Sequence, residues 1–150
     1  MLLEENYNPL KLENQICFPL YSVSRLLIQQ YKPLLDELNI TYPQYLVLLV
    51  LWENNEIPVK DISEKLLLET NTLTPLLKRM ETNGYLQRNR SKTDERMVII
   101  SLTKKGKDAH QKALEIPQKL VEKLDCFSVD KKEMEVMKSI LDKVIATVKN

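Results

Sequence analysis

Glycine is almost absent from this chain of 150 residues, which contains only Gly84 and Gly106. So few glycines cannot supply the turns of an all-β fold or the three close glycines of a dinucleotide fingerprint, and Gly84 and Gly106 are too far apart for the two glycines of a P-loop. Histidine is also scarce, because His110 is the only one, and this excludes zinc motifs built on two histidines. Two cysteines, Cys17 and Cys126, are too few for a four-cysteine metal site. We therefore expect neither a metal nor a cofactor.

Long apolar runs and a basic leader are also missing. The longest apolar run, residues 45–52, has eight residues, whereas a membrane helix needs about 18 or more. The N-terminus carries Glu4 and Glu5 instead of basic residues ahead of an apolar stretch. We expect no secretion signal and no membrane span, and therefore a cytoplasmic protein whose cysteines are thiols by default.

Charge is balanced over the whole chain, with a net charge of +1, but it is unevenly distributed. Residues 1–75 contain 5 Lys and Arg against 10 Asp and Glu, whereas residues 76–107 contain 9 against 3. Such a local positive excess is typical of a nucleic-acid contact, although a charged face exposed to solvent is the simpler alternative.

The first predicted helix has an apolar stripe with helical spacing, formed by Ile16, Leu20, Val23, Leu27 and Tyr31. Because proline clashes with the carbonyl four residues earlier, we expect Pro33 to end or kink this helix, with a separate short helix over 33–38. A capping box of Thr41 and Gln44 then precedes the apolar run 45–52. This run is apolar on every side, which predicts a central buried helix.

The middle of the chain predicts two helices and a hairpin. Residues 57–59 are expected to be extended, because the residue before a proline avoids the helical region. Helices are predicted over 60–68 and over 70–83, the latter ending at Gly84 as its C′ residue. Alternating apolar and polar residues predict strands over 86–90 and 98–102 that are joined by a polar tip.

Two more helices are predicted after the hairpin. Thr103 is expected to cap a long helix that reaches about residue 124. Asp130 and Glu133 form a second capping box in front of a last amphipathic helix. The fold class is therefore all-α with a small β-hairpin, in one compact domain or one subunit of an oligomer.

Helix, turn, helix and basic hairpin is the order of a winged helix-turn-helix, in which the second helix enters the major groove and the hairpin reaches the adjacent backbone or minor groove. Asparagine, threonine, lysine and arginine are suited to base edges and phosphates. The candidate DNA-binding residues on the second helix are Thr70, Asn71, Thr72, Thr74, Lys78 and Arg79, and those on the hairpin are Arg88, Arg90, Lys92 and Arg96. An ordinary helical pair beside a hairpin is the alternative.

The hairpin and the second helix resemble those of MarR-family transcription regulators. The resemblance lies in Asp94-Glu95-Arg96, in Leu102-Thr103-Lys104-Lys105-Gly106 and in residues 72–81. It implies a single MarR-like subunit, with dimerisation helices at about 1–40 and 108–150 and a winged-helix DNA-binding region at about 41–107.

The N-terminal part resembles the organic-hydroperoxide-responsive repressors of that family. The similar segments are residues 12–18, Leu20-Tyr21, residues 31–35 and residues 40–45, which reads Ile-Thr-Tyr-Pro-Gln-Tyr. The resemblance implies a homodimeric repressor on a palindromic operator, with an organic hydroperoxide as its signal. It also implies a peroxide-reactive cysteine at Cys17, bonded by Tyr31 and Tyr42 with Tyr21 close by, and a wing arginine at Arg96 that enters the minor groove.

Spacing limits how Cys17 can meet these tyrosines. Cys17 and Tyr21 are four residues apart and can touch on one helix. Cys17 and Tyr31 are 14 residues apart, or roughly 21 Å along a helix at ~1.5 Å per residue. Contact requires a bend or an antiparallel helix from a second subunit, and the resemblance favours the second subunit.

Several alternatives stay open at this stage. Cys126 could close a disulfide with oxidised Cys17 across the dimer, or a small thiol could cap Cys17 and leave Cys126 passive. The chain could instead be a MarR-type regulator that senses an aromatic or drug-like ligand in the dimer cleft. A thiol peroxidase acting through Cys17 and a winged helix that binds only proteins are more distant alternatives. We expect a regulator and not an enzyme.

Overall fold

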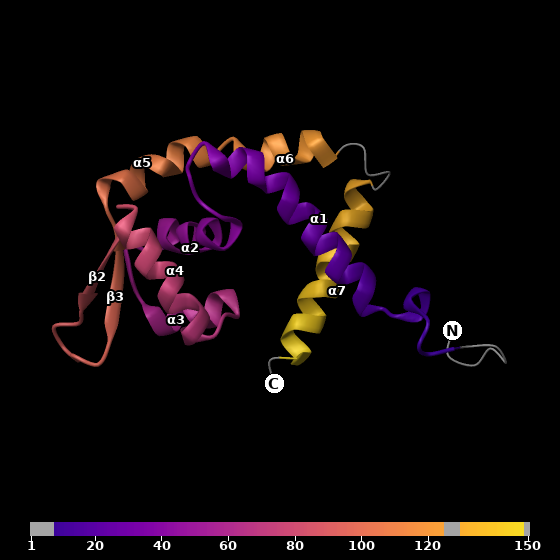
Figure 1. Cartoon of the computed structure of the whole chain (residues 1–150), viewed down its shortest axis with the longest axis horizontal. Helices are drawn as coiled ribbons and strands as arrows, with labels where there is room; N and C mark the ends of the chain where they lie inside the picture. The colour runs from indigo at the N-terminus through magenta and orange to yellow at the C-terminus, as the bar shows by residue number, and fades with distance from the viewer. Residues whose placement is uncertain (1–7, 125–129, 149–150) are drawn as a thin grey trace. The chain divides into compact units, whose positions relative to one another are not determined.

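The computed structural model describes residues 8–124 and 130–148, and Figure 1 shows its helices and strands. The elements are η1 (Leu12–Asn14), α1 (Cys17–Asp36), α2 (Tyr42–Glu53), β1 (Glu56–Pro58), α3 (Val59–Leu66), α4 (Thr70–Thr82), β2 (Leu86–Arg90), β3 (Val98–Leu102), α5 (Lys104–Ala113), α6 (Ile116–Leu124) and α7 (Lys131–Val148). The chain divides into two compact units, Met1–Pro117 and Gln118–Asn150.

Helix α2 is the centre of the first unit, as its uniformly apolar sequence predicts. Val47, Leu48 and Leu51 are buried, and α1, α3, α4, α5 and β3 all contact α2. The predicted capping box of Thr41 and Gln44 is present, with the Thr41 backbone N–H donating to Gln44 Oε1 at 2.8 Å. The capping box satisfies N–H groups at the start of α2 that have no partner within the helix.

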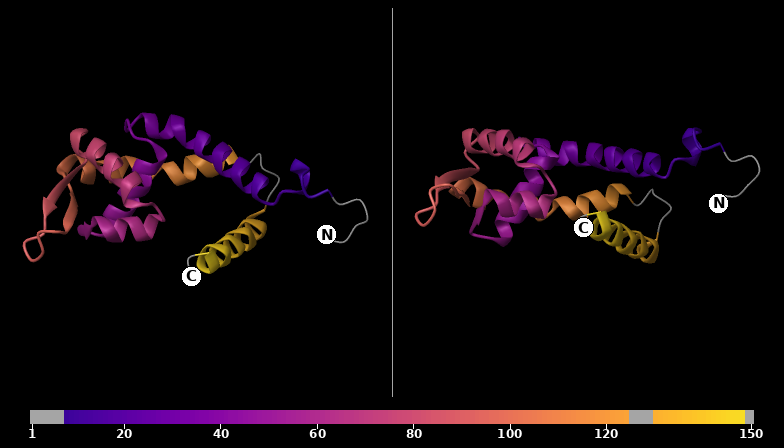
Figure 2. Two further views of the ribbon diagram at one scale, coloured as in Figure 1. Left: turned by 60° about the horizontal axis from the view of Figure 1, so that its bottom comes forward. Right: turned by 90° about the horizontal axis from the view of Figure 1, so that it is seen from below.

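The hairpin belongs to a small antiparallel sheet with the strand order β1-β3-β2. Residues 57–59 were expected only to be extended, whereas Glu56–Pro58 pairs with β3 as a third strand. Ile100 on β3 faces Ile57 on one side and Arg88 on the other. The two views in Figure 2 show the β2–β3 hairpin projecting from the helices of the first unit.

Gly84 ends α4 as predicted, in the left-handed conformation with φ +75°. Its N–H donates to the Glu81 carbonyl at 2.9 Å, and the Tyr85 N–H donates to the Met80 carbonyl at 3.0 Å. This pair of bonds is the Schellman motif, in which glycine adopts the left-handed conformation without strain. The motif turns the chain directly from α4 into β2.

Two expectations about helix boundaries were wrong. Helix α1 continues through Pro33 to Asp36, so no separate helix covers 33–38. Pro33 costs one hydrogen bond near the end of the helix, while Leu35, only 1% exposed, packs into the core and holds the last turn in place. The long helix expected over 103–124 is two helices, because the ring of Pro117 is incompatible with a helical carbonyl at Ala113.

The second unit contains α7, which begins as predicted. The Asp130 N–H donates to Glu133 Oε2, and the Glu133 N–H donates to Asp130 Oδ1, each at 2.8 Å. The apolar face of α7, including Ile140 and Val144, is largely exposed in the single chain. Over the described part of the chain, no helix is both long enough and apolar enough to cross a membrane.

Candidate nucleic-acid interface and cysteine site

Helix α4 presents one polar and one apolar face. Leu73, Leu77 and Met80 are fully buried against the core, which fixes the rotation of the helix about its axis. The opposite face exposes most of the residues predicted to contact DNA, namely Thr70, Asn71, Thr72, Lys78 and Arg79. Thr74 is half-buried, and its hydroxyl donates to the Thr70 carbonyl at 2.7 Å, so this side chain is engaged within the helix.

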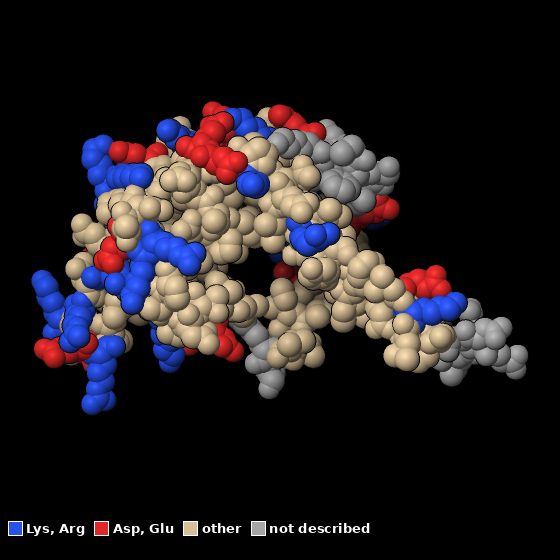
Figure 3. Space-filling model, viewed as in Figure 1, with Lys and Arg blue, Asp and Glu red and all other residues tan. Residues whose placement is uncertain are grey.

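The wing, which we define as β2, β3 and the tip 91–97 between them, exposes Arg90, Lys92 and Arg96. Asp94 organises the tip, because its carboxylate accepts the Arg96 N–H at 3.0 Å and its carbonyl accepts the Met97 N–H at 2.9 Å. Figure 3 shows Lys and Arg side chains gathered over this end of the first unit. The backbone of Arg96 is therefore held in a defined turn while its side chain stays free to reach a ligand.

Arg88 lies in a different environment from the other predicted wing residues. Its Nε donates to Glu81 Oε2 at 2.7 Å, and its backbone N–H donates to Glu81 Oε1 at 3.1 Å. This bonding holds the pKa of the Glu81 carboxyl below its usual range. Sequence reasoning missed Glu81. The available signal was the alternation in β2, which places Arg88 on the same face as the buried Leu86.

Cys17 is the first residue of α1 and is exposed. The N-terminus of a helix carries a partial positive charge. Tyr21 lies one turn later and is 64% exposed. The structure thus places Cys17 and Tyr21 on one helix, at the spacing that the sequence predicts.

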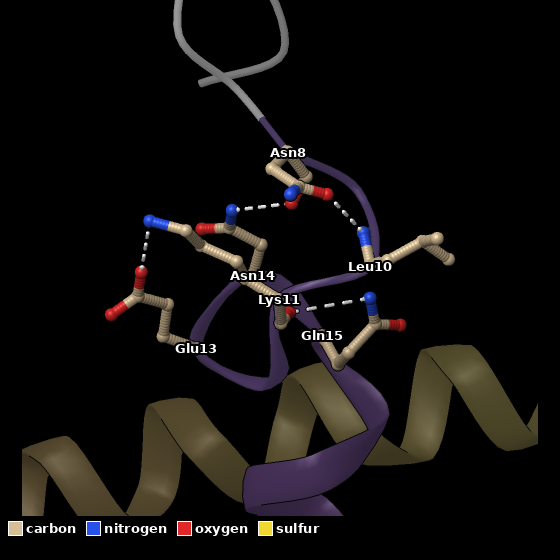
Figure 4. Close-up of polar contacts among 6 residues, drawn as sticks. All are labelled: Asn8, Leu10, Lys11, Glu13, Asn14 and Gln15. Atoms are coloured by element: carbon tan, nitrogen blue, oxygen red, sulfur yellow. Dashed lines mark hydrogen bonds and ion pairs between the residues drawn. The ribbon is translucent and has the colours of Figure 1, made fainter.

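The segment before Cys17 is ordered by its own polar contacts (Figure 4). The Asn14 amide donates to the Asn8 carbonyl at 2.8 Å, and the Leu10 N–H donates to Asn8 Oδ1 at 2.9 Å. Lys11 pairs with Glu13 at 3.4 Å. These contacts fold residues 8–15 back on themselves, and α1 follows directly with Cys17 in its first turn.

Tyr31 and Tyr42, the two tyrosines expected to bond the cysteine, lie together. Their ring centroids are 4.7 Å apart, and the ring of Tyr45 is 5.9 Å from that of Tyr31. Burial, together with the neighbouring phenols Tyr42 and Tyr45, raises the pKa of Tyr31 to about 12, and burial raises the pKa of Tyr42. Both phenols therefore keep their protons at neutral pH and can donate hydrogen bonds.

The structure does not bring Cys17 to this tyrosine pair within one chain. Helix α1 is continuous between Cys17 and Tyr31, so the two lie roughly 21 Å apart along the helix axis at ~1.5 Å per residue. Because a continuous helix cannot fold back on itself, Cys17 does not contact Tyr31 within one chain. Cys126, the candidate resolving cysteine, lies outside the described residues.

Known transcriptional regulators are similar to this chain in sequence and in fold. The family of transcriptional regulators described as SarA/Rot matches residues 29–113. The organic hydroperoxide resistance transcriptional regulator of Bacillus subtilis is 47% identical over 115 residues, which are 77% of this chain and 78% of that protein. A solved structure of MarR from Escherichia coli shares the fold, with a TM-score of 0.68, 23% identity and coverage of 87% of this chain and 96% of that chain.

This chain belongs to the MarR family of transcriptional regulators. Within the family it is related in sequence to the organic hydroperoxide resistance regulators, as its N-terminal segments predicted. The DNA-bound structure of reduced AbfR aligns with this MarR-family chain at a TM-score of 0.77, with 39% identity and 92% of each chain covered. AbfR, a Staphylococcus epidermidis protein, has also been solved overoxidised on DNA and with a disulfide formed. The predicted winged-helix fold and the role in DNA-binding regulation are thus confirmed, and these relatives are regulators, not enzymes.

Proposed function

We propose that this regulator is a homodimeric repressor that binds a palindromic operator and is released when an organic hydroperoxide oxidises Cys17. One observation carries the proposal. An exposed cysteine begins α1, and Tyr31 near the other end of α1 forms a half-buried pair of protonated phenols with Tyr42 of α2. The unbroken helix prevents the cysteine from meeting this pair within one chain.

The exposed apolar side chains of α1 favour a second copy of this chain as its partner. Ile16, the N-cap residue just before α1, is 72% exposed, and Leu20, Val23 and Leu26 are each 48% exposed. A continuous apolar surface on one helix marks an interface, because leaving it in water costs free energy. An antiparallel α1 from a second copy would cover these residues and bring its own Tyr31 and Tyr42 towards Cys17. The helices within residues 108–150 are proposed to contribute to the same dimer interface.

A dimer also suits the DNA-binding surface. Two copies of α4 related by a two-fold axis would enter two successive major grooves, and this requires a palindromic site. Asn71 and Thr72, near the start of α4, are positioned for base edges. Lys78 and Arg79 are suited to phosphates, and Arg90, Lys92 and Arg96 extend the contact along the backbone or into the minor groove.

The sensing reaction requires a thiolate at Cys17. The nearest basic residues in the sequence are Lys11 and Arg25, so the helix N-terminus and the phenol donors of the partner subunit are the proposed stabilisers. The thiolate sulfur attacks one oxygen of the hydroperoxide and the O–O bond breaks. The alkoxide leaves, takes up a proton and becomes the alcohol, while the sulfur is oxidised to a sulfenic acid. Sulfur gains an oxygen at the dimer contact, which changes the spacing of the two α4 helices.

The sulfenic acid then condenses with a thiol and releases water. Cys126 of the other subunit supplies this thiol in one route, and a small cellular thiol supplies it in the other. The disulfide form of AbfR supports the first route by analogy, and its overoxidised form, solved on DNA, shows that in that protein further oxidation is compatible with a DNA complex.

The decisive experiment compares wild type with Cys17→Ser on operator DNA, with and without an alkyl hydroperoxide. Serine keeps the size of cysteine and its hydrogen bonds, so the variant should bind the operator like wild type, yet it cannot form a sulfenic acid and should not be released. Tyr31→Phe or Tyr42→Phe should blunt release without abolishing oxidation. Release that survives Cys17→Ser would favour the ligand-sensing alternative, and steady-state peroxide turnover would favour a peroxidase.

Cys126→Ser separates the two thiol routes. If Cys126 resolves Cys17, peroxide should give wild type a reducible covalent dimer on a non-reducing gel, and Cys126→Ser should stay monomeric on that gel. If a small thiol caps Cys17, both proteins should gain its mass and neither should form a covalent dimer.

A further inference from the structure

We propose that Glu81 is a positioning residue for DNA binding, which holds the wing at a fixed angle to α4 through Arg88. The proposal rests on the assignment of α4 and the wing as the DNA-binding surface. It gives Arg88 a role different from the direct DNA contact that the sequence predicted.

The geometry of the pair fits this role. One carboxylate on α4 accepts two hydrogen bonds from a single residue of β2, from the backbone N–H at 3.1 Å and from the side-chain Nε at 2.7 Å. Because the two bonds go to the backbone and to the side chain of Arg88, they restrict the rotation of β2 relative to α4 as well as the distance between them. A single side-chain ion pair, such as Lys104–Asp108, fixes neither backbone.

The position of β2 in the sheet explains why such a contact is needed. In the order β1-β3-β2, β2 is an edge strand that pairs with β3 on one side only. Backbone N–H groups on its other side have no strand to bond. Glu81 accepts one of them, at Arg88, so the carboxylate completes the bonding of the strand edge and joins it to α4.

The consequence for DNA arises from the distance between this contact and the wing tip. Leu86, where β2 starts, is 1% exposed and firmly packed. Arg88 lies two residues further out, and the tip begins at Ser91, roughly 10 Å beyond Arg88 at ~3.3 Å per residue. A small rotation at Arg88 therefore displaces Arg96 by a distance comparable to a hydrogen bond. Because α4 and Arg96 must engage neighbouring grooves together, the angle between them should determine operator affinity.

Simple electrostatics makes the opposite prediction, which allows a sharp test. Glu81→Gln removes a negative charge close to the DNA-binding surface, and without a positioning role this should strengthen binding to phosphates. Asp108→Asn is the matched control, because it removes one negative charge from an exposed ion pair on α5. Affinity is measured on operator and on random duplex DNA, and thermal unfolding checks that each variant is folded.

We expect Glu81→Gln to lose roughly 2- to 30-fold in operator affinity, the range that corresponds to couplings of about 0.5–2 kcal/mol. Its affinity for random DNA should be unchanged or higher, and Asp108→Asn should match or exceed wild type on both DNAs. Hydroxyl-radical footprints of Glu81→Gln should lose protection where the wing lies while retaining it at the α4 contacts. A variant that was merely destabilised would lose protection in both regions of the DNA together.

A double-mutant cycle with Arg88→Gln tests whether Glu81 acts through Arg88. If it does, Glu81→Gln should add little to the loss already caused by Arg88→Gln. The proposal is overturned if Glu81→Gln binds the operator as Asp108→Asn does, or if the two losses add. If wild type shows no preference for any operator over random DNA, the proposed function itself fails, which is a separate outcome.

Discussion

The ring of Tyr31 on α1 lies 4.7 Å from the ring of Tyr42 on α2, measured between their centroids. The two tyrosines are 11 positions apart in the sequence, and the turn between α1 and α2 brings them together. The chain thus has a preformed pair of phenols at one end of α1 and the exposed Cys17 at the other. In the proposed dimer, a complete sensor is built only between subunits, and this couples cysteine chemistry to quaternary structure.

The raised pKa of Tyr31 predicts a loss of stability at alkaline pH. Burial raises the pKa of Tyr31 in the folded chain to about 12, from an ordinary value of 10.0. Because the folded state holds this proton more tightly, the contribution to stability is complete below pH 10 and is lost as the pH rises through about 12. Denaturant midpoints measured over this window should fall for wild type and fall less for Tyr31→Phe. Tyr21→Phe, which removes an exposed phenol, is the control and should behave like wild type.

Two parts of α4 should contribute differently to DNA recognition. Asn71 and Thr72 lie in the first turn, where a recognition helix meets base edges, whereas Lys78 lies about two turns later and is suited to phosphate. Asn71→Ala and Thr72→Ala should therefore reduce the ratio of operator to random-DNA affinity, by roughly 1–3 kcal/mol for each lost base contact. Lys78→Ala should weaken both affinities alike. Equal effects of all three variants on both DNAs would place base readout elsewhere.

Arg96→Ala should weaken operator binding without unfolding the protein. Arg96 is exposed, and Asp94 holds the backbone of the turn, so the truncation leaves no cavity. Losing one phosphate or minor-groove contact should reduce the slope of log affinity against log salt by about 1 per subunit contact. Lys138→Ala, which removes a positive charge from α7, is the control. An Arg96→Ala variant with the salt slope of wild type would remove the wing from the interface.

Most of the first unit follows from local sequence signals. The capping box of Thr41 and Gln44, Gly84 after α4 and the alternation in the hairpin each act within a few residues, so the sequence alone predicts these elements. The effect of a proline on a helix was harder to predict, because it depends on tertiary packing. Leu35 packs firmly enough to keep α1 intact beyond Pro33, whereas α5 ends before Pro117.

Only part of the candidate site, too, could be predicted from the sequence. The polar face of α4 and the exposed wing residues could be predicted, since helical and strand periodicity determine which way a side chain points. The Glu81–Arg88 contact could not, because it depends on the angle between α4 and β2, and a single sequence does not specify that angle. Arg88 looked like its exposed neighbours Arg90 and Lys92 until the partner on α4 was visible.

Gly106 lies where α5 passes close to the start of β2. A Cβ added at this position would lie 2.1 Å from the Tyr85 carbonyl oxygen and 2.8 Å from Leu102 Cδ2, so Gly106→Ala must push the first turn of α5 away. The Gly106 carbonyl also accepts the indole N–H of Trp52 at 3.0 Å, and Trp52 is the only tryptophan.

We expect Gly106→Ala to destabilise the fold by about 1–3 kcal/mol, as overpacking of a tight contact does. The emission spectrum of Trp52 should change in the native state, because its hydrogen bond is lengthened or lost. Lys107→Ala, at the next and exposed position of the same helix, should stay within about 0.5 kcal/mol of wild type. If Gly106→Ala unfolds at the denaturant midpoint of wild type with an unchanged emission spectrum, the close approach of α5 to Tyr85 is not what holds the helix beside the wing.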